Sequence, residues 1–490
     1  MLFNSLHFLI FFPIVTLIYY IIPLHFRYIW LLVSSYYFYM CWNPTYALLL
    51  LLSTSITYVS GLCLEKFQHN IAQKTCVAVS FTLNLSILFF FKYFNFTIET
   101  FQRMLGIIHI DIQIPSFDVL LPVGISFYTF QALSYTMDVY RKEISAETNF
   151  ARYALFVSFF PQLVAGPIER SKNLLIQLRN PTKLTWYRFR EGLLLMLWGF
   201  FLKLVISDRI AIFVDTIYTN YTSYEGWYFI VATILFAFQI YCDFGGYSVI
   251  AMGTATILGI QLMENFESPY LSSSVSEFWR RWHISLSSWF KDYLYIPLGG
   301  SHKGPIRKHL NKMIVFLTSG LWHGAKWTYV IWGALNGIYQ VIGELLTPLR
   351  SYLIKLFHLN PKSLGIRLMK IITTFILIDF SWIFFRSNSF KGAIVIIKSI
   401  LTANNFNIFR DGSLYECGLN LQNFILLISC IIILIISDIC KYHNIQIRHT
   451  ILQQRCWIRW IIFSSSLCFI LLFGIWGSGY SEANFIYFQF

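Results

Sequence analysis

Apolar runs of membrane-spanning length recur along this chain from end to end. A helix that crosses a bilayer needs about 20 mostly apolar residues, and such runs leave little sequence for a soluble domain. Charged residues make up only 12% of the chain, whereas soluble domains carry about 25%. The runs therefore predict an all-α, polytopic membrane protein, with residues 1–490 forming a single membrane-embedded domain in the lipid bilayer.

Ten apolar runs are predicted to cross the membrane, with both termini outside. They are Leu6–Ile22, Tyr28–Trp42, Thr45–Leu64, Val77–Phe91, Val119–Met137, Leu193–Ile206, Trp227–Cys242, Ile371–Phe385, Phe424–Ile439 and Trp460–Trp476. The run Val119–Met137 carries enough Ser, Thr and Gln to predict a helix that faces the interior of the bundle. The run Phe156–Ile168 is too short to cross and contains two prolines, which favours a re-entrant or interfacial segment.

The formal net charge of +14 comes from Lys and Arg in the loops between the apolar runs. This distribution is typical of cytosolic loops in membrane proteins. No basic domain lies outside the membrane, so nucleic-acid binding is not expected. The nine cysteines are scattered, without the spacing of a metal site, so we predict no metal.

The stretch Ser276–Gly324 is the centre of the functional prediction. Basic stretches at Arg307–Lys312 and Arg350–Lys370 predict that the segment between them is a hairpin that enters from the cytosol and returns. The apolar run Met313–Trp322 measures about 15 Å as a helix, about half of a hydrocarbon core about 30 Å thick. His323 is therefore expected near mid-depth, at the apex of the hairpin.

An ionisable side chain at membrane depth is a functional-site hypothesis by default. A neutral imidazole can take a proton from an attacking hydroxyl or orient a thioester. Glycines on either side of His323 would let donor and acceptor approach the backbone. The alternative is a structural histidine bonded to a backbone carbonyl.

His283 lies in the sequence WRRWHISLSSWF, whose helical repeat predicts an amphipathic interfacial helix. The functional alternative is that His283 lines the mouth through which an acyl donor enters. Arg280 and Arg281 would then suit a phosphate-rich donor, although lipid headgroups explain them equally well.

Two further polar residues are candidates for a supporting role. Asp243 follows an apolar span and precedes two glycines, so it is expected to fix a broken helix or to orient a neighbouring group. Gln131 lies on a polar helix and would line a substrate path, with helix–helix hydrogen bonding as the alternative.

Several blocks of this sequence resemble the membrane-bound O-acyltransferase superfamily, and within it the bacterial alginate O-acetyltransferase-like branch. They occur in family order, with the core at about residues 119–346. The blocks are VGISFYTFQALSYTMDVYR (123–141), FPQLVAGPIER (160–170), YCDFGGYSVIAMG (241–253), SEFWRRWHISLSSWFKDYLYIPLGG (276–300), GLWHGAKWTYVIWGALNG (320–337) and WIFFR (382–386).

The resemblance implies that His323 is the family's essential histidine and His283 its second characteristic histidine, with Trp322 and Gly324 in the same motif. It implies about 10–12 membrane helices with re-entrant hairpins, in a ring around a central funnel, in the bacterial inner membrane. The implied donor is acetyl coenzyme A or an acyl-carrier thioester, with no bound cofactor. The implied partner is an extracytoplasmic SGNH-type acetyltransferase that passes acetyl to a polysaccharide.

Three alternatives to O-acetyl transfer stay open at this point. One is a teichoic-acid D-alanyl transferase, which belongs to the same superfamily. The second is a transporter without chemistry. The third is a scaffold that docks an outer enzyme through the aromatic tail at residues 485–490.

Overall fold

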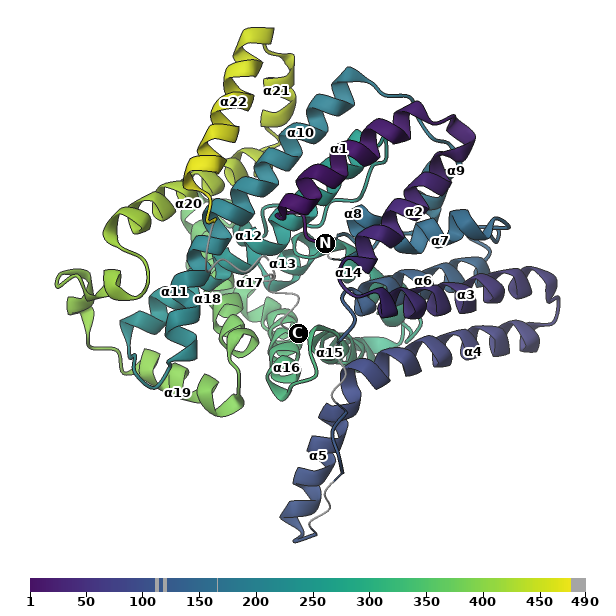
Figure 1. The fold of residues 1–490 in the computed structure, drawn as a ribbon. Helices are drawn as coiled ribbons and strands as arrows, with labels where there is room; N and C mark the ends of the chain where they lie inside the picture. The colour runs from purple at the N-terminus through teal and green to yellow at the C-terminus, as the bar shows by residue number, and fades with distance from the viewer. Residues whose placement is uncertain (111–113, 118–120, 165, 477–490) are drawn as a thin grey trace. The chain divides into compact units, whose positions relative to one another are not determined.

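The computed structural model describes residues 1–110, 114–117, 121–164 and 166–476 of the chain. Within these ranges the regular structure is helical, with one isolated backbone bridge between Phe266 and Trp282 and no strand. Six helices in this part of the chain are long and apolar enough to cross a membrane (Figure 1). They are α3 (Pro44–Lys66), the continuous helix Asn70–Ile107, α12 (Trp227–Ile257), α18 (Leu364–Arg386), α20 (Leu421–Tyr442) and α22 (Cys456–Phe473). The all-α, polytopic fold is thereby confirmed, whereas the ten crossings and the outside position of both termini stay predictions.

Contacts within the chain divide it into two compact units. Unit 1 comprises Met1–Met196 and Ala251–Met263, and unit 2 comprises Leu197–Ile250 and the chain from Glu264 onward. Helices α10 (Trp186–Phe200) and α12 each contribute to both units. The prediction of a single domain over residues 1–490 stays a prediction, and each unit is described by itself.

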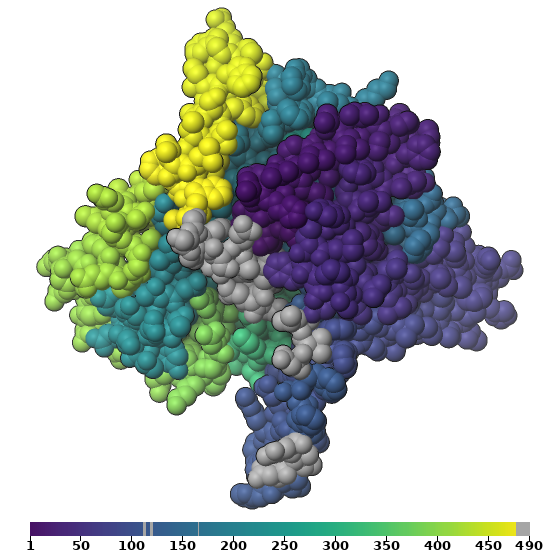
Figure 2. Space-filling view, viewed as in Figure 1, coloured from purple at the N-terminus to yellow at the C-terminus, as the bar shows by residue number. Residues whose placement is uncertain are grey.

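Each of the first four predicted spans in unit 1 is one helix. The helix α4 does not end at Phe91, because a π-helical turn, Phe89–Tyr93, carries it into α5. Figure 2 shows α5 projecting from the other helices of unit 1. The helices of this unit, besides α3, are α1 (Leu6–Ile21), α2 (Arg27–Met40), α4 (Asn70–Leu88), α5 (Phe94–Ile107), α6 (Ile125–Tyr140), α7 (Phe150–Ser158), α8 (Phe160–Leu163) and α9 (Ser171–Arg179).

The polar helix of unit 1 is α6, and its polar side chains face inward as predicted. Those of Ser126, Thr129, Gln131, Ser134 and Thr136 are all buried. The start of the predicted run, residues 119 and 120, lies outside the described residues, and the helix begins at Ile125. Burial of Gln131, Ser134 and Thr136 is tolerated because their side chains hydrogen-bond to neighbouring helices and backbone carbonyls.

The short segment predicted to be unable to cross forms two short buried helices. α7 ends at Ser158, and α8 begins at Phe160 with Pro161 in its first turn. The Phe160 N–H donates to Ser35 Oγ of α2 at 3.1 Å, which satisfies the donor at this break. The nine residues of α7 measure about 14 Å, so this helix is too short to span a bilayer.

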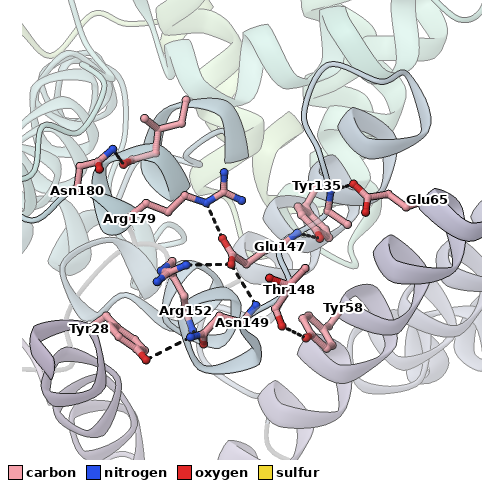
Figure 3. A network of polar contacts seen from close by, with 12 residues as sticks. Tyr28, Tyr58, Glu65, Tyr135, Glu147, Thr148, Asn149, Arg152, Arg179 and Asn180 are labelled. Atoms are coloured by element: carbon pink, nitrogen blue, oxygen red, sulfur yellow. Dashed lines mark hydrogen bonds and ion pairs between the residues drawn. The ribbon is translucent and has the colours of Figure 1, made fainter. Parts of the chain in front are cut away.

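A buried carboxylate joins the loop after α6 to other helices of unit 1 (Figure 3). Glu147 is 1% exposed and accepts hydrogen bonds from Arg152 at 3.1 Å and from Arg179 Nε at 2.8 Å. The Glu147 N–H donates to the Tyr135 hydroxyl at 2.9 Å. Two guanidinium groups thus compensate one buried negative charge, and α6, α7 and α9 are held at one point.

Unit 2 contains most of α12, from its start to Ile250. Its other elements are the π-helical turn η3 (Phe201–Ser207), α11 (Asp208–Thr219), α13 (Val275–Arg281), α14 (Ile284–Phe290), α15 (Gly304–His323), α16 (Trp327–Leu345), α17 (Thr347–Leu356), α19 (Phe390–Leu401), α21 (Ile447–Gln453), α18, α20 and α22.

The prediction that Asp243 fixes a broken helix is wrong, because α12 passes through Gly245 and Gly246 without interruption. A Cβ atom on Gly199 of α10 would lie 2.7 Å from Gly246 O. The glycines therefore serve close packing of two helices rather than a break in one of them.

Candidate active site

The predicted hairpin is present, and His323 is the last residue of its first helix, α15. α16 begins at Trp327, so three residues make the turn. α15 is 20 residues long, about 30 Å, because it also includes the basic residues before Met313. The apex position of His323 is confirmed, and its depth in the membrane stays a prediction.

Glycines bring the two helices of the hairpin together. A Cβ atom on Gly320 would overlap the Tyr329 carbonyl, and one on Gly333 would overlap the Phe316 carbonyl. Gly324 is extended, with a φ of −166°, and a Cβ atom there would overlap the Tyr329 ring. The Cβ positions of Gly320 and Gly324 are thus filled by α16, and the expectation that these glycines admit donor and acceptor stays a prediction.

His283 does not lie on a continuous amphipathic helix, so that prediction is wrong. The chain breaks between α13 and α14, and His283 adopts a left-handed conformation with a φ of 44°. A 3.6-residue repeat in the sequence cannot reveal such a break, because it describes the spacing of side chains and not the sign of the backbone angle φ. Non-glycine residues in this region cost about 1–3 kcal/mol and cluster at functional sites.

Asn265 holds the break at His283 in place. Its side-chain oxygen accepts from Ser285 N–H at 3.1 Å and lies 3.4 Å from His283 Nδ1, while its backbone oxygen accepts from Ile284 N–H at 3.0 Å. The Asn265 oxygen can only accept, so a hydrogen bond here requires the tautomer with the ring proton on Nδ1, in which Nε2 is a hydrogen-bond acceptor. Ser285 Oγ also lies 3.4 Å from Nδ1.

The two histidines face each other in the interior of unit 2. Their ring centroids lie 6.4 Å apart with an interplanar angle of 62°. Exposure is 0% for His283 and 4% for His323. Burial lowers the pKa of His283 from 6.5 to about 3, so this imidazole is neutral at physiological pH.

Aromatic rings surround the His323 imidazole. The ring centroids of Trp322 and Trp332 lie 5.0 Å from it, and that of Phe385 lies 5.4 Å from it. Trp332 also stacks on Trp382 at 5.7 Å. We call Trp332, Trp382 and Phe385 the aromatic wall. The wall comes from α16 and α18 and restricts water at the imidazole, which strengthens electrostatic interactions there.

Asp243, on α12, belongs to a buried ion cluster with Lys203 and Asp208. Lys203 Nζ lies 2.6 Å from Asp243 Oδ1 and 2.8 Å from Asp208 Oδ1. The next residue, Phe244, packs its ring 4.7 Å from that of His283. Asp243 therefore anchors the helix whose neighbouring side chain supports His283.

The two arginines before His283 have different surroundings. Arg281 pairs with Glu277 at 3.1 Å and lies 4.7 Å over the Tyr442 ring. Arg280 is exposed. Arg281 is thus engaged within unit 2, and Arg280 is the better placed of the two for an external phosphate.

Gln131 lies in unit 1, where its side-chain nitrogen donates to Phe156 O at 2.6 Å. This bond favours the structural alternative, and its place on a substrate path stays a prediction.

Sequence reasoning missed Asn265, Asn336, Trp332 and Phe385 as site residues. The signal for Asn336 was an amide within the apolar run of α16, where it is fully buried. No group of three or more His, Cys, Asp or Glu with metal-site geometry was found among the described residues.

Comparison with known proteins identifies the family of this chain. The model described as "MBOAT, membrane-bound O-acyltransferase family" matches residues 18–359. "Probable alginate O-acetylase AlgI" of Pseudomonas syringae pv. tomato is 37% identical over 394 residues, which cover 79% of this chain and 73% of the relative. "Peptidoglycan O-acetyltransferase" of Helicobacter pylori is 32% identical over 505 residues, and the alignment covers 94% of this chain and 91% of the relative.

A more distant relative is "Teichoic acid D-alanyltransferase" of Bacillus subtilis, 26% identical over 237 residues, which cover 46% of this chain and 59% of the relative. The family match covers more than half of the chain and includes both histidines. The chain therefore belongs to the membrane-bound O-acyltransferase family and is a multi-pass membrane acyltransferase.

Proposed function

We propose that this protein transfers an acetyl group from a cytosolic thioester across the membrane for O-acetylation of a cell-envelope glycan. The observation that carries the proposal is the buried pair of His323 and His283 at the apex of the α15–α16 hairpin. The non-enzymatic transporter and scaffold alternatives are set aside, because the chain belongs to a family of acyltransferases. The tail at residues 485–490, on which the scaffold alternative relied, lies outside the described residues.

In the proposed reaction His323 acts as the general base. It takes the proton of the acceptor hydroxyl while the hydroxyl oxygen attacks the thioester carbonyl carbon. The C–S bond then breaks, and the departing sulfur takes the proton from the imidazolium. The products are an acetyl ester and a free thiol, so atoms and charge balance. His283, neutral and with Nε2 as an acceptor, orients an N–H or O–H group of a substrate.

We propose acetyl coenzyme A or an acyl-carrier thioester as the donor substrate, with Arg280 at its phosphate. Arg280 is exposed and precedes the segment that carries His283. An exposed guanidinium suits a phosphate because it can bind two oxygens at once. The proposed acceptor on the outer face is a separate extracytoplasmic acetyltransferase of the SGNH type. The proposed location is the bacterial inner membrane.

Peptidoglycan is the first glycan to test. The relative named for peptidoglycan aligns with 94% of this chain, whereas the relative named for alginate aligns with 79%. D-alanyl transfer to teichoic acid is the second candidate, favoured only by a relative that aligns with 46%.

The test is the O-acetyl content of the cell-envelope glycans in cells carrying His323→Ala at matched protein abundance. We expect loss of the ester, and His443→Ala, which alters an exposed histidine after α20, should leave it unchanged. Unchanged ester in His323→Ala cells would overturn the assignment of His323. Loss of D-alanyl ester with intact O-acetyl ester would favour the second candidate.

A further inference from the structure

Asn336 is a fully buried amide in the apolar helix α16. Its side-chain oxygen accepts from Trp279 Nε1 at 3.1 Å. Its side-chain nitrogen donates to Trp332 O at 2.9 Å and to Ser381 Oγ at 3.3 Å. Without partners a buried amide would be costly, so these bonds tie α13, α16 and α18 together at one point.

The direction of each hydrogen bond follows from its partners. The Trp279 indole can only donate, so the amide oxygen must face it. The Ser381 hydroxyl donates its proton to Ile378 O at 2.7 Å, so toward Asn336 it can only accept. The amide of Asn336 satisfies both demands at once. An isosteric group without the NH₂ donors cannot do so.

Two of the three helices that Asn336 ties, α16 and α18, carry the aromatic wall. Trp332 lies one turn before Asn336 on α16, and Phe385 lies one turn after Ser381 on α18. Both rings contact the His323 imidazole. The third partner, Trp279, packs its ring 5.5 Å from that of Trp332.

A second contact holds α16 one turn before Asn336. Gly333 packs against the Phe316 carbonyl, and an added Cβ atom would overlap it. α16 is therefore held both by this glycine contact and by the Asn336 hydrogen bonds. Loss of the hydrogen bonds leaves Trp332 and Phe385 to move relative to His323.

We propose that Asn336 is a positioning residue for catalysis, which holds the aromatic wall against the His323 imidazole. This inference rests on the proposed function, because it needs His323 to be the reacting group. It predicts that Asn336 variants lose turnover more than donor binding. A shift of about 1 Å in a supporting group costs up to about 100-fold in rate.

The variants are Asn336→Leu, which keeps the size and removes the hydrogen bonds, and Asn336→Asp, which keeps the shape. Asn311→Leu and Asn311→Asp are matched controls, because Asn311 is also fully buried and lies on α15. Asn311 donates to Gly300 O at 2.9 Å, away from the wall. Glycan O-acetyl content is measured in cells at matched abundance. Initial rates are measured in membrane vesicles with radiolabelled acetyl coenzyme A.

We expect Asn336→Leu to lower the rate at saturating donor by about 10-fold to 100-fold, with the apparent KM for acetyl coenzyme A within about two-fold of the wild type. The Asn311 variants should keep their rate per folded molecule. The rate of the Asn336→Asp variant, relative to the wild type, should depend on pH. A protonated carboxyl keeps one donor for Ser381 and a carboxylate keeps none, so its relative rate should fall as pH rises.

Wild-type ester content and rate in Asn336→Leu at normal abundance would overturn the proposal. So would an equal loss per folded molecule in Asn311→Leu, since that would indicate a general effect of buried amides. The proposed function is tested separately. An active His323→Ala variant would overturn the role of His323, whatever the result for the Asn336 variants. Inactive His323→Ala together with active Asn336→Leu would remove only the positioning role.

Discussion

The Lys203 ammonium lies 2.6 Å from the Asp243 carboxylate in the interior of unit 2, and both side chains are at most 3% exposed. The same ammonium lies 2.8 Å from Asp208. Taking ions out of water is unfavourable, so each member of this cluster depends on the others.

Lys203→Met is expected to destabilise the protein by about 3–5 kcal/mol, because it removes the cation from two buried carboxylates. Thermal unfolding in detergent measures the effect. Lys172→Met is the control, because Lys172 is 57% exposed where it pairs with Glu143, and surface pairs contribute about 0–1 kcal/mol. Equal melting temperatures for the two variants would contradict the prediction.

Glu147→Gln tests the carboxylate of unit 1 that Arg152 and Arg179 share. The amide cannot accept two charge-assisted bonds and leaves two guanidinium groups without their anion, which is expected to cost about 2–4 kcal/mol. Glu143→Gln changes a more exposed carboxylate in the same loop and should cost less than about 1 kcal/mol. The experiment compares the thermal unfolding of both variants. A smaller loss of stability for Glu147→Gln than for Glu143→Gln would contradict the prediction.

Gly324→Ala places a methyl group where the Tyr329 ring lies. Because the backbone is extended there, the effect is steric and not conformational. We expect a loss of about 1–3 kcal/mol in stability and at least about 10-fold in glycan acetylation per folded molecule. Gly343→Ala on α16 is the control, because a Cβ atom there meets nothing within 4 Å. Full activity in Gly324→Ala would contradict the prediction, because it would mean that the Tyr329 ring moves aside without disturbing His323.

His283 predicts a pH dependence of stability. Its pKa is about 3 in the folded protein against 6.5 in the unfolded chain, so between these values the unfolded state binds more protons. Stability should therefore fall as pH falls below about 6.5. His283→Asn should flatten this part of the unfolding profile between about pH 7 and about pH 4. An unchanged slope would mean that other groups account for the acid sensitivity.

Local sequence properties predicted most of the helices. The apolar run Phe424–Ile439, which lies within α20, could be predicted without knowledge of its neighbours, because bilayer thickness sets the length of such a run. The polar side chains of α6 likewise predicted an inward face. The hairpin at His323 followed from the charge of the loops on both sides of it.

Features that depend on distant partners could not be predicted in this way. The position of Asp243 after an apolar span and before two glycines indicated a break, but Lys203, 40 residues earlier in the chain, neutralises its carboxylate inside a continuous helix. The bend at His283 depends on Asn265, 18 residues before it. Two of the three hydrogen-bond partners of Asn336 lie 57 and 45 residues away, and hydropathy cannot predict such pairs.

The end of α15 at His323 has an electrostatic consequence. The peptide dipoles of a helix add up to about half a negative charge at its C-terminus. Any positive charge that develops on the His323 ring during proton transfer would lie within the last turn of a 20-residue helix. Such a field stabilises a cation by about 0.3–1 kcal/mol at a surface and by up to about 2 kcal/mol when partly buried. The helix that carries His323 thus also contributes a field that stabilises positive charge at this end.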